Sequence, residues 1–127
     1  MAKRSKRKNR IPRDVAEIVA ERAGGFCEIM NRESGCNGRA EHMHHRQLRS
    51  QGGEHTVSNL VHICAACHYW IHNNTGASYD VGWLVRSTRE PETEPFFRRG
   101  GVVILMPDGE MEGVEDGGEQ RYSGASA

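Results

Sequence analysis

Large apolar and aromatic side chains are scarce in this sequence of 127 residues. Hydrophobic residues make up 36% of the chain and aromatic residues only 6%, which leaves little material for a core. No stretch is apolar for long enough to cross a membrane, and neither an internal repeat nor a Gly-rich phosphate loop is present. We therefore expect one small domain with a thin core and no membrane partner, stabilised in addition by a structural metal.

A net charge of one sign is also missing, because 17 Lys and Arg balance 17 Asp and Glu. The charges are nevertheless unevenly placed: seven of the 17 basic residues lie within 3–13, and six of the 17 acidic residues lie within 108–119. The segment 1–13 lacks apolar periodicity and repels itself, so it predicts a disordered basic arm that suits a polyanion. The alternative is a tail that only aids solubility. The acidic, Gly- and Ser-rich segment 115–127 predicts disorder as well.

Four histidines carry most of the chemical information: the neighbours His44 and His45, and the pair His68 and His72. We expect 40–45 to form a strand, on which neighbouring side chains leave on opposite faces, so one histidine can reach a metal while the other faces a substrate. His68 and His72 have helical spacing and can close on one ion. Since neutral imidazole binds divalent metals and also takes up protons, the pattern predicts a metal-dependent hydrolytic site that gathers His44, His68 and His72.

The other histidines predict less specific roles. His42 shares a strand face with His44 and is the nearest substitute ligand. We expect His62 near the site without a metal bond, and His55 in a loop. His72 has an alternative of its own, because a histidine near the end of a helix can simply favour the negative C-terminal dipole.

Four cysteines form two spaced pairs, Cys27 with Cys36 and Cys64 with Cys67. No apolar signal segment precedes them, so a cytoplasmic location is expected, where disulfides are rare. Coordination of a structural zinc by four thiolates is then the favoured interpretation. The alternative is that the cysteines are small buried hydrophobic residues.

The flanking segments predict ordinary packing elements. Pro12 and Asp14 indicate the start of a helix, with Asp14 as its N-cap, and Gly24 and Gly25 indicate its end. We expect this helix to pack on the zinc site. Farther along, 102–106 and 111–114 predict the two strands of a β-hairpin.

Several motifs, in order and together, resemble those of the HNH endonucleases with their ββα-metal motif: His44-His45-Arg46, the Gly52-Gly53 loop, Ser58-Asn59-Leu60 and Cys64-x-x-Cys67-His68. The resemblance covers roughly residues 26 to 73. It implies that His44 is the first metal ligand and that His45 is the general base that activates water. It also implies that Asn59 holds the His45 loop or orients His45.

In the same resemblance His68 is a second metal ligand and His72 a further one. Many members carry an aspartate where His44 stands, and some have a proline shortly after the base, where this chain has Gln47 and Leu48. From its place beside the base, Arg46 is expected to bind a neighbouring phosphate.

The resemblance implies an α+β fold: a small single domain with a ββα-metal core, a four-cysteine zinc site, and flexible basic N-terminal and acidic C-terminal tails. We expect the basic arm over 1–13, the nuclease domain over 14–85, a C-terminal extension over 86–114 and the tail over 115–127.

The expected function is hydrolysis of DNA phosphodiester bonds with weak sequence preference, using Mg²⁺, Mn²⁺, Ni²⁺ or Zn²⁺ as the catalytic ion beside the structural zinc. The alternative is a non-catalytic, zinc-stabilised DNA-binding or packaging accessory protein. Small basic-tailed proteins that resemble this one are common in bacteriophages, where they are associated with terminase-driven DNA packaging. DNA, a terminase or another packaging protein are thus the predicted partners, in the host cytoplasm.

Deletion of residues 1–10 tests the role of the basic arm. The deletion should weaken DNA binding at low salt and spare the chemistry at saturating DNA, because the arm would contribute phosphate contacts only. Each lost contact lowers the slope of log affinity against log salt by about 0.9 on duplex DNA. Affinity measured over a series of salt concentrations gives this slope. An unchanged slope would show that the arm is a solubility tail.

Overall fold

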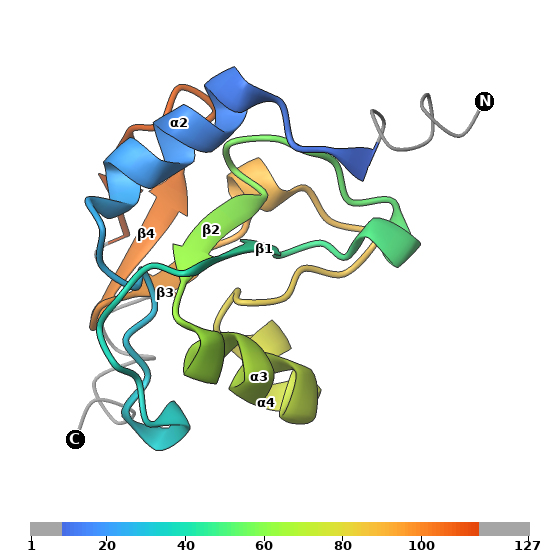
Figure 1. Ribbon diagram of the computed structural model, residues 1–127. Helices are drawn as coiled ribbons and strands as arrows, with labels where there is room; N and C mark the ends of the chain where they lie inside the picture. The colour runs from blue at the N-terminus through green and yellow to red at the C-terminus, as the bar shows by residue number, and fades with distance from the viewer. Residues whose placement is uncertain (1–8, 115–127) are drawn as a thin grey trace.

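The computed structural model describes residues 9–114, and most of the predicted basic arm and the whole acidic tail lie outside them. Helices and two antiparallel sheets combine in a small single α+β domain, as predicted (Figure 1). Within the described part, no helix is long and apolar enough to span a membrane. The elements are α2 (Arg13–Ala23), η1 (Arg32–Ser34), β1 (His42–His45), η2 (Arg49–Gln51), β2 (Leu60–Ile63), α3 (Ala65–Asn73), α4 (Thr75–Asp80), η3 (Pro91–Thr93), β3 (Phe96–Arg98), β4 (Gly101–Leu105) and β5 (Met111–Gly113).

The predicted succession of two strands and a helix is confirmed by β1, β2 and α3. The strands β1 and β2 are antiparallel, with His44 opposite Val61 and His45 opposite Leu60. The apolar side chains of β2 are buried on both faces of this two-stranded sheet. The packing of these side chains holds β2 in place. The helix α3 follows β2 after a single residue, Cys64. Cys64 also begins the helix, because its sulfur accepts a hydrogen bond from the amide of Cys67 at 3.3 Å.

The helix α2 lies across β2 on the side away from α3 (Figure 1). Its buried Val19 packs with Val57 and Leu60, apart from the larger core that contains the cysteines. The expectation that this helix packs on the zinc site is thus wrong, because its buried Val19 packs on Val57 and Leu60 and not on the cysteines. Asp14 is not the N-cap either, since Pro12 takes that position and Asp14 lies inside the first turn. The predicted end at Gly24, which adopts a left-handed conformation, is confirmed.

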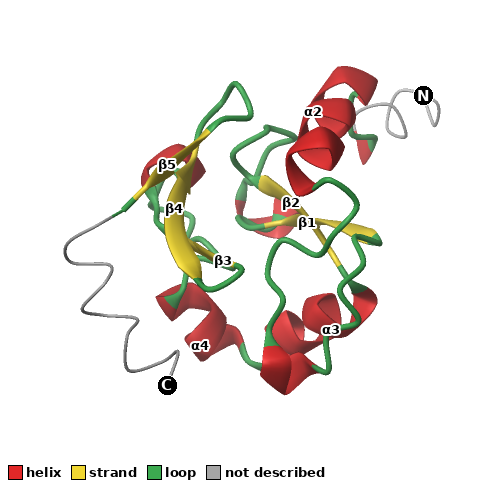
Figure 2. Ribbon diagram, turned by 90° about the vertical axis from the view of Figure 1, so that its left-hand side faces the viewer, coloured by secondary structure: helices red, strands yellow, loops and turns green. Residues whose placement is uncertain are grey.

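The segment after α4 forms the second sheet, in the order β3-β4-β5 (Figure 2). The predicted hairpin is present, with Leu105 of β4 opposite Met111 of β5. Phe96 and Leu105 are completely buried and join the core that also holds Trp83 and the cysteines of the predicted zinc site. The C-terminal segment thus completes a core that the strands and helices of 42–73 cannot close alone.

The structure overturns the expected role of Arg46. Its side chain is completely buried, so it cannot reach a phosphate. Its guanidinium donates to four backbone carbonyls at 2.8 to 3.0 Å: those of Gly82, Ser58, Pro91 and Glu94. It also lies 5.1 Å from the centre of the Phe96 ring. Burial lowers the pKa of Arg46 to about 9, which still leaves the group charged at neutral pH. Arg46 therefore joins the end of β1 to the segments that follow α4.

Replacement of Arg46 by Met should lower the free energy of unfolding by about 3 kcal/mol or more, because each carbonyl left without a donor costs about 1 kcal/mol or more. Urea unfolding of parent and variant measures this loss. Arg89→Met is the matched control, since the Arg89 side chain is exposed and should change stability little. Parent-like stability of Arg46→Met together with weaker DNA binding would restore the phosphate role.

Candidate functional site

Three histidines from two elements meet at the junction of β1 and α3. The structure brings His44, His68 and His72 together, with one ring nitrogen from each lying within 4.8 Å of the others. The centres of the His68 and His72 rings are 5.0 Å apart, as the helical spacing predicts. His44 is buried, His68 is partly buried and His72 is exposed, so the cluster opens to solvent on one side. An ion held there would remain accessible to a substrate.

Hydrogen bonds decide which ring nitrogens are available to a metal. The Nε2 atom of His44 lies 2.8 Å from the carbonyl oxygen of Trp83, which can only accept, so Nε2 carries the hydrogen and Nδ1 keeps its lone pair. The Nδ1 atom of His68 lies 3.0 Å from Nδ1 of His42, so Nε2 is the nitrogen of His68 that lies outside this contact. Outer partners of this kind fix the tautomer and orientation of metal-binding histidines.

The electrostatics of the cluster favour neutral imidazoles. Burial lowers the pKa of His44 to about 3, although the hydrogen bond to Trp83 opposes the shift. Burial, and then the proximity of His72 and His42, lowers the pKa of His68 to about 4. Both rings are therefore unprotonated at neutral pH, which is the state that binds a divalent metal.

His45 lies on the opposite face of β1 from His44, as the alternation predicts. It faces the loop between β1 and β2, where its Nε2 atom lies 3.0 Å from Nδ1 of His55. Burial, and then the proximity of His55, lowers the pKa of His45 to about 4, so this ring too is neutral at pH 7. His45 and His55 are both partly exposed, and neither belongs to the cluster of His44, His68 and His72.

Asn59 holds the backbone of the loop that follows His45. Its side-chain oxygen accepts from the amide of Gln47 at 2.6 Å, and its Nδ2 atom donates to the carbonyls of Gln47 and Glu54 at 3.0 Å. Of the two roles considered for Asn59, the structure thus shows the contact with the loop backbone. Gly53 closes the same loop tightly, because a Cβ at this position would lie 1.6 Å from the Gln47 carbonyl oxygen.

Cys27, Cys36, Cys64 and Cys67 form a second cluster, with all four sulfurs within 4.8 Å of one another. The sulfurs of Cys36 and Cys64 are 3.6 Å apart, close to the spacing of about 3.8 Å that tetrahedral bonds of about 2.3 Å to zinc would give. The long loop between Cys27 and Cys36 is closed at its base, where the amide of Cys27 donates to the carbonyl of Gly38 at 3.0 Å.

The chemistry of these four thiols fits a cation. A hydrogen bond from Cys67 lowers the pKa of Cys27 to about 5, and the same contact raises the pKa of Cys67. Burial raises the pKa of Cys36 to about 11, and further ionisation is disfavoured by the negative charge of Cys27. Only a bound cation lets all four become thiolates together. Backbone amides of Met30 and Gly38 already point at the sulfurs of Cys27 and Cys36, at 3.4 and 3.3 Å.

Charged side chains brace this cysteine loop. Glu28 is completely buried and accepts from Arg22 of α2 at 2.8 Å and from Arg98 of β3 at 3.0 Å. Burial alone would raise the pKa of Glu28, but the hydrogen bonds and charge of Arg22 hold it below its usual range. Arg99 donates to the carbonyls of Ala23, Phe26 and Cys27 at 2.6 to 3.1 Å.

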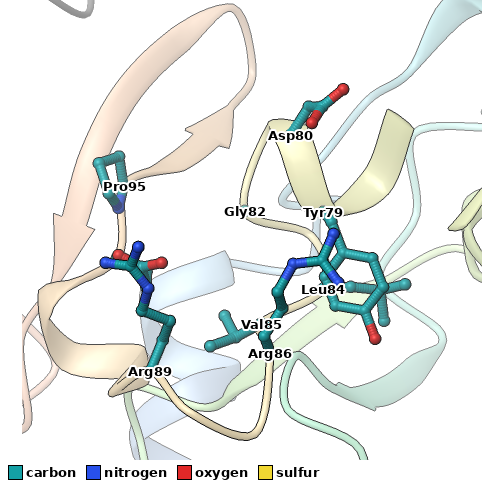
Figure 3. A pocket seen from close by; sticks show the side chains of 9 residues that line it. Tyr79, Asp80, Gly82, Leu84, Val85, Arg86, Arg89 and Pro95 are labelled. Carbon is teal, nitrogen blue, oxygen red and sulfur yellow. The ribbon is translucent and has the colours of Figure 1, made fainter. Parts of the chain in front are cut away.

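An open cavity of about 360 Å³ lies outside both clusters, between α4 and the segment before β3 (Figure 3). Arg86 lies over the ring of Tyr79 at 4.3 Å, and Arg89 lies on the other side of the cavity. Asp80 and Glu94 also line it, so its cations are balanced by carboxylates. This balance does not favour an anionic ligand.

Two partners of the site gave no signal in the sequence. His55 was expected only to lie in a loop, and its contact with His45 depends on how that loop folds back. The carbonyl of Trp83 is a backbone group, which no side-chain pattern can reveal. For His42, the shared strand face did indicate proximity to His44, and the structure places its ring 5.2 Å from that of His68.

The comparisons with known proteins agree with this geometry. A family model described as HNH endonuclease matches residues 27–74. Searches of curated proteins and of solved structures gave no match. The matched segment contains the four clustered cysteines, the three clustered histidines, His45 and Asn59. This segment, with its two strands, its helix and its two clusters of candidate metal ligands, is thus similar to an HNH endonuclease domain.

Proposed function

We propose that this protein is a metal-dependent endonuclease that hydrolyses DNA phosphodiester bonds, by nicking or by cleaving both strands. The observation that carries the proposal is the convergence of His44, His68 and His72 on one point beside a neutral His45. Such a site combines a place for a divalent ion with a proton acceptor on the adjacent residue. A neutral imidazole beside this point can accept a proton, which favours the enzyme over a non-catalytic DNA-binding accessory.

The metal ligands in this proposal are His44 through Nδ1, His68 through Nε2, and His72. When bound, a divalent ion such as Mg²⁺, Mn²⁺, Ni²⁺ or Zn²⁺ stabilises the negative charge that develops on the phosphate and on the departing 3′ oxygen. The three imidazoles would hold it on the side of the domain where His72 is exposed. A DNA backbone can approach from that side.

His45 would take the proton from the attacking water. Its ring is neutral at pH 7 and its Nε2 is engaged with His55, so Nδ1 is the nitrogen that remains outside this contact and would accept that proton. Asn59 would keep the ring in place by holding the backbone two residues further along, at Gln47. In this proposal the ion and these residues act on the phosphate and not on a base, which supports weak sequence preference.

The biological setting is a narrower proposal. Action with a terminase in bacteriophage DNA packaging, in the host cytoplasm, rests on the resemblance to small basic-tailed proteins of this family. Co-purification with a terminase subunit is the measurement that would support it.

Replacement of Cys64 tests the structural zinc. Cys64→Ser should remove one zinc ion per chain and unfold the core, because the binding free energy of a structural zinc is largely folding free energy. Cys36→Ser should cause a smaller loss, because Cys36 is partly exposed and water can take its place. Metal analysis and circular dichroism of the purified variants measure both effects. Parent protein that is folded and contains no zinc would contradict this assignment.

Separate replacement of His45 and His44 tests the division between base and ligand. His45→Ala should keep the fold and the affinity for the catalytic ion, while turnover falls by about 10² to 10⁴ because a positioned proton acceptor is lost. His44→Ala should lose metal affinity, and excess metal should partly restore its activity. Asn59→Ala should resemble a milder His45→Ala.

The measurement is plasmid nicking against the concentration of each divalent ion, beside a calorimetric metal titration. His62→Ala is the control, because His62 lies on β2 outside both clusters. Parent-like cleavage by His45→Ala, or loss of the metal by His45→Ala with retention by His44→Ala, would reverse the assignment. A parent that nicks DNA with none of the four ions would leave the non-catalytic DNA-binding function.

A further inference from the structure

The contact between His45 and His55 is the part of the site that the metal cluster does not explain. The two rings have centres 5.1 Å apart, and their nearest nitrogens, Nε2 of His45 and Nδ1 of His55, are 3.0 Å apart. At this distance one nitrogen donates a hydrogen and the other accepts it. His55 is not among the three histidines that converge on a common point.

The loop that carries His55 is held at several points, so the contact has a defined geometry. On the N-terminal side of His55, Gly53 donates its amide to the carbonyl of Leu48 at 2.9 Å and accepts from the guanidinium of Arg49 at 2.8 Å. The neighbouring carbonyl of Glu54 accepts from the Asn59 side chain at 3.0 Å.

Asn59 joins the two segments that bear these histidines. It bonds to Gln47, two residues after His45, and to Glu54, one residue before His55. One buried side chain therefore sets the distance between both backbones, which is the arrangement needed to hold one ring against the other.

We propose that His55 is the positioning residue for His45: its Nδ1 accepts the Nε2 hydrogen of His45 and thereby fixes the orientation and tautomer of that ring. The proposal rests on the proposed function, in which His45 takes a proton from water. For Nδ1 of His45 to accept this proton, the ring hydrogen must sit on Nε2, and His55 is the acceptor that keeps it there. Once His45 is protonated, the same bond is strengthened by its positive charge.

The arrangement places a base against a third group that orients it, as in other sites where a histidine accepts a proton. The group here is an imidazole and not a carboxylate. It can hold the ring in place without adding a negative charge beside the scissile phosphate.

Plasmid nicking by His55→Ala, His55→Asn and the control His62→Ala tests the proposal, with the catalytic ion and the DNA both at saturation. His55→Ala should lower turnover by about tenfold to a hundredfold and leave the KM for DNA unchanged, because a misplaced base slows only the chemical step. His55→Asn should recover most of the turnover, since its side-chain oxygen can accept the same hydrogen. His62→Ala should cleave like the parent.

A nitrogen-15 spectrum of the imidazoles supplies a measurement that does not depend on cleavage. In the parent, His45 should carry its hydrogen on Nε2, with slow exchange against water. His55→Ala should lose this slow exchange, and His55→Asn should keep it.

The outcomes separate this proposal from the one on which it rests. Parent-like turnover of His55→Ala, with a parent that nicks DNA, would overturn the role of His55 and leave the endonuclease intact. Weaker binding of the catalytic ion by His55→Ala would also overturn it, because His45 and His55 would then be a ligand pair. A parent protein that does not nick DNA with any of the four ions would overturn the proposed function, and the role of His55 would fall with it.

Discussion

The buried guanidinium of Arg46 is the constraint on which the arrangement of this domain depends. A charge inside a protein is tolerated only when hydrogen bonds replace the water that it loses. Arg46 achieves this with backbone carbonyls from Ser58, Gly82, Pro91 and Glu94, which belong to three separate stretches of the chain. Because Arg46 directly follows β1, satisfying it also fixes the end of the strand that presents His44 and His45. The hydrogen bonds of the Arg46 guanidinium thus help to position the neighbouring histidines.

A second buried charge acts in the same way on the cysteine side of the domain. Glu28 unites α2 and β3 through Arg22 and Arg98, and Arg99 reaches the carbonyl of Cys27. These hydrogen bonds fix how α2, β3 and the cysteine loop are oriented relative to one another, because a hydrogen bond is directional and hydrophobic packing is not. This matters in a core with few large apolar side chains. The strands at the C-terminal end therefore support the loop between Cys27 and Cys36 in addition to covering the core.

Three histidines of the candidate site each use one ring nitrogen in a contact with an outer partner. His44 gives one nitrogen to Trp83, His68 one to His42, and His45 one to His55. In each ring the other nitrogen is left for a metal or a proton. An imidazole has only two nitrogens, so a fixed outer partner also determines which atom can react.

Local patterns in the sequence determined the two clusters of candidate ligands and the order of the elements. The helical spacing of His68 and His72, the alternation at His44 and His45 and the paired cysteines depend on short periodicities that a strand or helix imposes by itself. Only the tertiary structure decided that Arg46 is buried and that His55 meets His45, because both depend on loops returning from distant positions. Arg46 looked like a phosphate ligand because sequence shows its charge and not its exposure. Burial and loop closure are properties of the whole chain, and no local pattern encodes them.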